Sequence, residues 1–333
     1  MTHLPALRFT SVTDLAEFPD HLRGAVVAIG NFDGVHRGHR AVLDAALAVA
    51  HGREVPAFVL TFEPHPRTVF APDKPVFRLT PAEERARIVA AYGFDGIVTA
   101  PFTRAFASIE AEAFVEDILR QRMGIVHAVT GYDFHFGRAR RGTPEFLVEA
   151  GAADGFGVTI VTAETDEAGE AVSSSRIRAA LAEGDVTLAN ALLGYRWFFS
   201  AEVAHGDKRG RELGYPTANL ALAEETALAH GIYAVRVRVD GRVHDGVASF
   251  GRRPTFDNGA PLFEVHLFDF TGDLYGRKME VMLAGHLRPE ERFDSAEALV
   301  DQMNRDSAEA RALLASLTPL GDLDLALNAW PDQ

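Results

Sequence analysis

The sequence predicts an α/β domain followed by a smaller β domain with a C-terminal helix, and three observations carry this prediction. In the first half, short apolar runs alternate with helical stretches, which is the pattern of a doubly wound parallel sheet. In the second half, longer alternating strands flank a tight Asp-Gly turn, which predicts a small antiparallel barrel. The length of 333 residues suits two domains. We place their boundary near Asp185, which gives domains of residues 1–185 and 186–333.

The composition describes an ordinary globular protein, with 47% hydrophobic and 24% charged residues. The net charge of −14 argues against binding to nucleic acid or to an anionic membrane surface. The chain has no cysteine, which excludes disulfides, thiolate metal sites and a cysteine nucleophile. The sequence shows neither a signal-peptide pattern nor a long apolar run. We therefore expect a cytoplasmic enzyme that holds anionic substrates through local basic groups, glycine loops and a metal ion.

Strands and helices alternate through the first half. Strands are predicted at residues 25–29, 55–62, 96–99, 125–130 and 158–163, and helices at 40–50, from 80, at 111–121 and from 143. Thr80 is expected to cap its helix, with Pro81 as the first helical residue.

The second half begins with a short helix that Asp185 should cap and Gly194 should end. Strands are then predicted at residues 232–239, 243–250, 262–270 and 278–287, followed by a helical region at 294–317. The turn Asp240-Gly241 joins the first two of these strands as a hairpin.

The first candidate site is residues 30–39, Gly-Asn-Phe-Asp-Gly-Val-His-Arg-Gly-His, between the first strand and helix. Backbone N–H groups and the positive end of a helix dipole meet there, which favours anions. His36 and His39 are expected to share a face of the starting helix. Their imidazoles could donate hydrogen bonds to the negative charge that develops on a leaving pyrophosphate. A zinc half-site is an alternative, although no third ligand stands at a typical spacing. A plain turn with solvated histidines is another.

Three further motifs follow in the first half. Thr-Phe-Glu-Pro-His-Pro at residues 61–66 places a rigid loop at a strand end, where ligands of open α/β sheets bind. Residues 131–142 form a loop in which Asp133 could hold a ribose or metal and several arginines could hold phosphate, or which is a solvated basic turn. Residues 173–178, Ser-Ser-Ser-Arg-Ile-Arg, predict an anion site at a helix start, or a simple serine cap with surface arginines.

The second half carries one glycine-rich basic stretch, residues 206–219, which ends in Gly-Tyr-Pro-Thr-Ala-Asn. Thr217 and Asn219 lie on one side of an extended chain and offer oxygen ligands suited to Mg²⁺. The alternative is a turn with an incidental threonine and asparagine. Further along, Glu264 is flanked by apolar residues on a predicted strand, and a half-buried carboxylate there suits a general base.

These motifs resemble the signatures of the bacterial bifunctional riboflavin kinase/FAD synthetase family, in the family's order, from about residue 20 to 316. The resemblance implies that the second domain uses ATP to phosphorylate riboflavin to FMN. It implies that the first domain then joins FMN to the AMP part of ATP, giving FAD and pyrophosphate. Mg²⁺ is the implied cofactor, and the resemblance leaves the oligomeric state open.

The resemblance also assigns roles to residues. The implied catalytic residues are Glu264, His36, His39 and Arg178. The implied ATP and phosphate ligands are Gly30, Phe32, Asp33, Gly34, Gly38, Asp133, Ser174, Ser175, Gly206, Lys208, Gly210 and Gly214. The implied flavin contacts are Phe62, Pro64, His65, Arg253 and Pro254, and the implied metal ligands are Thr217 and Asn219.

The chain departs from the family pattern at Ser249, where an asparagine is usual, and at Ala171, where some members carry a basic residue. His135 also replaces a residue that is often basic, and we assign it no role. Two rival functions remain: a riboflavin kinase with a decayed transferase domain, and a flavin-binding regulator without turnover. The intact histidine and serine motifs argue against the first, and Glu264 with the Thr217/Asn219 pair argues against the second.

Overall fold

The computed structural model describes residues 9–205, 214–252 and 261–327. The chain divides into two compact units, residues 1–173 and 174–333, which are described separately. Within the described residues, no helix has the length and apolar composition needed to cross a membrane.

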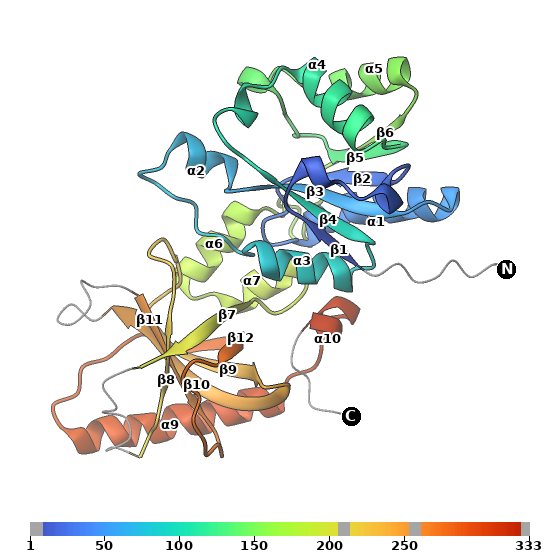
Figure 1. The fold of residues 1–333 in the computed structure, drawn as a ribbon. Coiled ribbons are helices and arrows are strands. Elements are labelled where there is room, and N and C mark those ends of the chain that lie inside the picture. The colour runs from blue at the N-terminus through green and yellow to red at the C-terminus, as the bar shows by residue number, and fades with distance from the viewer. Residues whose placement is uncertain (1–8, 206–213, 253–260, 328–333) are drawn as a thin grey trace. The chain divides into compact units, whose positions relative to one another are not determined.

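The first unit is built on a parallel sheet of six strands in the order β1-β4-β3-β2-β5-β6 (Figure 1). Its strands are β1 (Thr10–Val12), β2 (Val26–Ile29), β3 (Ala57–Glu63), β4 (Gly96–Pro101), β5 (His127–Gly131) and β6 (Gly157–Val161). The doubly wound parallel sheet is therefore confirmed. Only the short edge strand β1 has no counterpart among the predicted strands.

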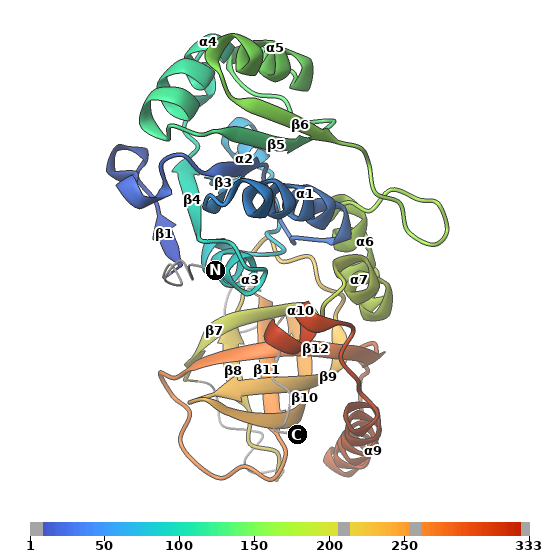
Figure 2. The same ribbon diagram turned by 90° about the vertical axis from the view of Figure 1, so that its right-hand side faces the viewer.

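Helices cover this sheet on both faces, with α4 and α5 on one side and α1 and α3 on the other (Figures 1 and 2). The helices of the unit are α1 (Arg37–Arg53), α2 (Pro66–Phe70), α3 (Ala82–Ala91), α4 (Ala111–Ala113), the π-helical continuation η4 (Phe114–Arg122) and α5 (Pro144–Asp154). Short 3₁₀ turns are η1 (Leu15–Glu17), η2 (Asp20–Leu22), η3 (Phe106–Ser108) and η5 (Arg138–Arg140).

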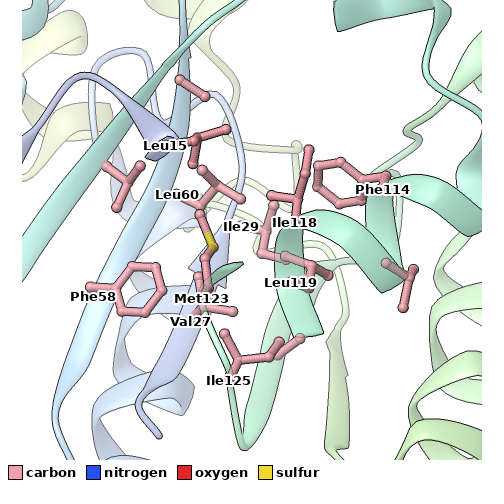
Figure 3. Close-up of a cluster of buried hydrophobic side chains, with 14 of the residues drawn as sticks. Leu15, Val27, Ile29, Phe58, Leu60, Phe114, Ile118, Leu119, Met123 and Ile125 are labelled. Carbon is pink, nitrogen blue, oxygen red and sulfur yellow. The ribbon is translucent and has the colours of Figure 1, made fainter. Parts of the chain in front are cut away.

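One face of the sheet forms a buried core with η4, shown in Figure 3. Alternate residues of β2 and β3 point to this face because side chains alternate along a strand. Val27, Ile29 and Leu60 are at most 1% exposed there. From the helix side, Phe114 and Leu119 close the layer. This packing holds the carboxyl ends of β2 and β3 side by side, where the candidate site lies.

The start of α3 differs from the prediction. Pro81 holds the cap position and Ala82 is the first helical residue, so Thr80 does not cap the helix. Its hydroxyl accepts a hydrogen bond from the Gly34 N–H at 2.8 Å, and its own N–H donates to Asp33 Oδ1 at 3.1 Å. A tertiary contact to the loop after β2 thus replaces the local cap, and this contact has no local signature.

The second unit is a closed antiparallel barrel with the strand order β10-β11-β8-β7-β12-β9 (Figure 2). Its strands are β7 (Phe198–Ala204), β8 (Ala218–Ala221), β9 (Gly231–Val239), β10 (Arg242–Arg252), β11 (Pro261–Leu267) and β12 (Lys278–Arg288). Its helices are α6 (Ser174–Glu183), α7 (Val186–Leu193), α9 (Ala296–Ala315) and α10 (Asp322–Leu327).

Local signals in this unit behave as predicted. Asp185 caps α7 through a 2.9 Å bond from Leu188 N–H, and Gly194 ends the helix in the left-handed conformation. The hairpin turn at Asp240 and Gly241 has φ of 49° and 74°, as a two-residue turn of this kind requires. Strands β7 and β8 have no counterpart among the predicted strands. They become strands by pairing with each other and with β12 and β11.

Candidate active sites

The loop after β2 turns sharply before it enters α1. Phe32, Gly34 and Val35 have φ of 45°, 90° and 35°. Positive φ is uncommon for phenylalanine and more so for β-branched valine. Such backbone persists only where the surroundings hold it, and it clusters at ligand sites. The loop leaves the carboxyl end of a central parallel strand, which is where open α/β sheets bind ligands.

His36 and His39 lie stacked at the start of α1, with ring centroids 3.6 Å apart and planes 16° from parallel. His36 is the N-cap residue, and its Nδ1 accepts the His39 N–H at 3.3 Å. Because Nδ1 is an acceptor, a neutral His36 ring carries its proton on Nε2, which can donate to a phosphate oxygen. The positive end of the α1 dipole adds to the attraction for an anion.

Gly38 is required by the packing around these rings. A Cβ at Gly38 would lie 3.1 Å from the Val172 carbonyl oxygen and 3.3 Å from Cε1 of His36. Any side chain there would have to displace the backbone at Val172 or the His36 ring. The glycine between the two histidines therefore preserves their stacked arrangement.

The same loop is anchored by buried charges. Asp33 is 1% exposed and forms an ion pair with Arg78, with Nε and Oδ1 3.4 Å apart. Arg78 also pairs with Glu63 at the end of β3, and Arg85 donates to the same Glu63 oxygen at 3.0 Å. Burial, and after it the charge of Arg78, lowers the pKa of the Arg85 guanidinium. Sequence reasoning singled out none of Glu63, Arg78 and Arg85, because charge pairs between separate strands and loops leave no local spacing pattern.

The loop after β3 lies at the neighbouring strand end. His65 is half-buried and caps α2, with Nδ1 accepting the Arg67 N–H at 3.2 Å, while Pro64 is exposed. Phe62 is buried and its ring packs against Phe102 and Phe106 at 5.9 and 5.8 Å. The loop therefore leaves Pro64 accessible and His65 partly accessible, whereas Phe62 is buried in an aromatic cluster.

Asp133 follows β5, the strand on the other side of β2, and its carboxylate is exposed. It folds back over Gly131, where an added Cβ would lie 3.2 Å from Oδ1. His135, which was assigned no role, bonds through Nδ1 to the Asp133 carbonyl at 2.9 Å. Among the nearby arginines, Arg138 pairs with Glu110 at 3.0 Å and so is partly neutralised.

The serine motif opens α6, which belongs to the second unit. Ser174 and Arg178 are four residues apart and half-buried, so they share a face of the first turns, and Ser175 beside them is exposed. The adjoining stripe of the helix, with Ile177, Ala180 and Leu181, is buried. The helix thus keeps its hydroxyls and Arg178 on a side that an anion can reach.

In the barrel, strand register brings three separate residues into one row. Glu264 on β11 lies directly opposite Asn219 on β8 and opposite Ser249 on β10. Their neighbours Phe263 and Leu220 are fully buried inside the barrel, so the row lies on the outer face. Directly opposite residues have Cβ atoms about 4.5–5.5 Å apart. Glu264 is therefore flanked by an amide and a hydroxyl.

The segment before β8 is tied to the same face. His266, two residues after Glu264, bonds through Nδ1 to the Pro216 carbonyl at 2.9 Å. The Tyr215 ring packs on His266 with centroids 4.8 Å apart, and its hydroxyl donates to Asn304 Oδ1 of α9 at 2.6 Å. These contacts fix the backbone that delivers Thr217 and Asn219 next to Glu264.

Comparisons with known proteins cover both units. Residues 18–176 match the family described as FAD synthetase, and residues 193–314 match the family described as riboflavin kinase. A bifunctional riboflavin kinase/FMN adenylyltransferase of Pseudomonas fluorescens is 44% identical over 299 residues, covering 89% of this chain and 95% of the relative. The Escherichia coli K12 protein of the same name is 40% identical over 309 residues, covering 92% and 98%.

The chain belongs to the bifunctional riboflavin kinase/FMN adenylyltransferase family.

A solved structure also shares the fold of this family member. It is named as a macrolide-efflux protein from Streptococcus pneumoniae, is 32% identical, and aligns with a TM-score of 0.81. The alignment covers 93% of this chain and 99% of that one. The family resemblance and the fold class drawn from the sequence are thus both confirmed.

A divalent metal fits the barrel site of this family member. Asn219 is 7% exposed, and its Oδ1 is buried without a hydrogen-bond partner among the described residues. A buried amide oxygen without a partner is costly unless a ligand satisfies it. The described residues hold no cluster of three or more His, Cys, Asp or Glu suited to a metal. Thr217 and Asn219 oxygens, together with substrate phosphates, would form the kind of hard-oxygen set that Mg²⁺ takes.

Several predicted ligands cannot be placed. Gly206, Lys208 and Gly210 of the basic stretch, and Arg253 and Pro254 of the flavin-side loop, lie outside the described residues. Gly214 is described: it is exposed and has φ of 81°, a conformation that glycine adopts without strain. Two groups of predicted site residues are each assembled within one unit of the described structure. They are the loop after β2 and the barrel row of Asn219, Ser249 and Glu264.

Proposed function

We propose that this chain makes FAD from riboflavin in two steps, each with its own set of reactive side chains. The barrel transfers the γ-phosphate of ATP to the 5′-hydroxyl of riboflavin, giving FMN and ADP. The second step joins FMN to the AMP part of another ATP and releases pyrophosphate. The observation that carries this proposal is that each unit of this family member holds its own assembled set of reactive side chains.

In the kinase step, Glu264 accepts the riboflavin hydroxyl proton as the new O–P bond forms. Its position on a regular strand, flanked by Asn219 and Ser249, supports this role because a base must be held within hydrogen-bond reach of its proton. Thr217 and Asn219 would hold Mg²⁺ together with ATP phosphates. The ion would supply charge neutralisation of those phosphates.

In the adenylyl transfer, an FMN phosphate oxygen attacks the α-phosphorus of ATP and the bond to pyrophosphate breaks. The FMN phosphate is largely ionised at pH 7, since its second pKa is about 6, so no general base is required. Positioning and charge stabilisation carry the step. We assign the stabilisation to His36 and His39, and phosphate binding to Ser174, Ser175 and Arg178.

We propose the remaining contacts from the family resemblance. ATP would contact Gly30, Phe32, Asp33, Gly34, Gly38, Asp133 and Gly214, and the flavin would contact Phe62, Pro64 and His65. We also propose that Asp185 marks the boundary between the two functions. Helix α6, which carries the serine motif on the transferase side of that boundary, belongs to the compact unit that contains the barrel.

Incubation of the purified protein with riboflavin and MgATP tests the proposal. FAD is the expected product, with FMN as the intermediate. FMN alone would indicate a kinase whose transferase site has decayed. Binding of riboflavin without any product would indicate a flavin-binding regulator, and either result would overturn the two-step assignment.

A further inference from the structure

The buried charges beneath the loop after β2 point to an unassigned contributor to adenylyl transfer. We propose that Arg78 is a positioning residue for this reaction, tying the loop that carries the stacked histidines to the loop that is proposed to hold the flavin. The inference rests on the proposed function of the first unit. It names a residue that touches neither reacting group and acts through two carboxylates.

Four charged groups meet at the carboxyl ends of β2 and β3. Asp33 is 1% exposed and Arg85 is fully buried, while the side chains of Arg78 and Glu63 are 13% and 33% exposed. The two strands are neighbours, with Ile29 opposite Leu60, and β3 continues to Glu63 beside the start of the loop after β2. The group therefore lies beneath both loops, with two positive and two negative charges.

Arg78 forms ion pairs both with the loop after β2 and with the last residue of β3. Its Nε lies 3.4 Å from Asp33 Oδ1, and its Nη2 lies 3.1 Å from Glu63 Oε2. Arg85 donates a 3.0 Å hydrogen bond to the same Glu63 oxygen, and its charge also acts on Asp33. Removing Arg78 would take a positive charge from beside the buried Asp33 carboxylate, and loss of one member of a buried ion pair is strongly destabilising.

The burial of the Arg78 guanidinium argues against its direct contact with a substrate. All three guanidinium nitrogens are buried, and none makes a hydrogen bond within the described residues. The two ion pairs therefore act through charge rather than through a bidentate fork of hydrogen bonds. A lysine would supply the same charge, so the contact does not require the planar geometry that usually makes arginine irreplaceable.

Asp33 transmits the effect of Arg78 to the histidines. Asp33 Oδ1 also accepts the Thr80 N–H at 3.1 Å, and the Thr80 hydroxyl accepts the Gly34 N–H at 2.8 Å. Two residues after Gly34, His36 caps α1. The loop between them has positive φ at Gly34 and Val35, so it depends on such anchors to keep its shape. A shift of Asp33 would be passed directly to the two rings.

The test compares Arg78→Met, Arg78→Lys and Glu63→Gln with the unmodified full-length chain in the conversion of FMN and ATP to FAD. A displacement of about 1 Å can cost about 10²-fold in rate, so we expect kcat of Arg78→Met to fall about 10- to 100-fold. The KM values for FMN and ATP should stay within about threefold, since no substrate contact is removed. Arg78→Lys should recover most of the rate because it keeps the charge.

Glu63→Gln breaks the other half of the link while keeping the shape of the side chain, and should also lower kcat. Because both changes cut one link, the loss in the double variant should be smaller than the product of the single losses. Arg120→Met is the matched control, since it removes an arginine whose ion pair with Glu116 is exposed. Riboflavin phosphorylation by the same preparations shows whether the second unit is folded. Circular dichroism shows whether the secondary structure of the whole chain, including the first unit, is retained.

Several outcomes would overturn the proposal. They are a kcat for Arg78→Met within about threefold of the control, a raised KM with unchanged kcat, or an equal loss in Arg78→Lys. If Arg78→Met does not fold, Glu63→Gln decides, and a control-level kcat there would sink the idea. Absence of FAD formation in the unmodified chain would instead refute the proposed function itself.

Discussion

The first unit assembles its candidate site from one continuous loop, whereas the barrel takes its residues from three strands that are distant in sequence. His36 and His39 are neighbours through the start of a helix. Asn219, Ser249 and Glu264 become neighbours only through strand register. The loop has strained backbone and needs buried anchors, while the barrel row is held by regular ladder hydrogen bonds. A site that is easy to recognise in sequence can therefore be the one that depends more on tertiary support.

The largest expected effect separates the two sites completely. His36→Ala combined with His39→Ala should abolish FAD formation, because loss of one donor to developing charge typically costs about 10²–10³-fold. FMN formation should remain near the level of the unmodified chain, since the two histidines and the barrel row belong to separate compact units, and sites that share no partners are usually independent. Product analysis by chromatography after incubation with riboflavin and MgATP measures both. A collapse of FMN formation in a variant with an unaltered circular dichroism spectrum would refute the two-site scheme.

The reciprocal change tests the barrel. Glu264→Gln keeps the size of the side chain but cannot accept the hydroxyl proton, and loss of a general base typically costs about 10²–10⁴-fold. Riboflavin phosphorylation should fall by that order with little change in riboflavin binding. The same preparation supplied with FMN should make FAD at the normal rate. A kinase rate within about threefold of the unmodified chain would leave Glu264 as a structural carboxylate of the barrel.

A smaller effect is expected at Ser249, where the family usually has asparagine. The register places this side chain directly opposite Glu264, so a longer amide there reaches further over the proposed base. One added hydrogen bond contributes a net 0.5–1.5 kcal/mol, so Ser249→Asn should lower the KM for riboflavin roughly 2- to 10-fold. Steady-state kinetics of FMN formation measure this. A raised KM would show that the serine suits this barrel better than the family's residue.

The smallest expected effect is a loss of folding stability at acidic pH. His127 at the start of β5 is 8% exposed, and burial, followed by the charge of Arg53, lowers its pKa below the usual 6.5. As the pH falls below about 6.5, His127 therefore becomes protonated more readily in the unfolded chain than in the folded chain, which favours unfolding. The first unit should lose stability in that range, and His127→Gln should lose less. A loss of about 1 kcal/mol corresponds to about 2–4 °C in melting temperature for a unit of this size.

Thermal unfolding of the full chain at pH 7.5 and pH 5.5 measures this last effect. The decisive quantity is the difference between the two pH values in the unmodified chain, compared with the same difference in His127→Gln. Equal differences in the two proteins would show that other groups set the acid response.

The fold class, the alternation of strands and helices and the contiguous motifs could all be predicted from local sequence patterns. Hydrophobic period, capping residues and turn glycines act over a few residues, so Asp185, Gly194 and the Asp240-Gly241 turn have the structures that their local chemistry predicts. The loop at residues 30–39 could be recognised for the same reason, because its function needs adjacent residues.

Tertiary structure alone decided the rest. Strands β7 and β8 form because they pair with each other in the barrel. Thr80 does not cap its helix because its hydroxyl and its N–H form hydrogen bonds with Gly34 and Asp33. The Asn219–Glu264–Ser249 row and the Arg78 link join residues that are between 15 and 45 positions apart in the chain. No local pattern encodes such contacts, because register and buried charge pairing are settled only when the sheet closes and removes these groups from water.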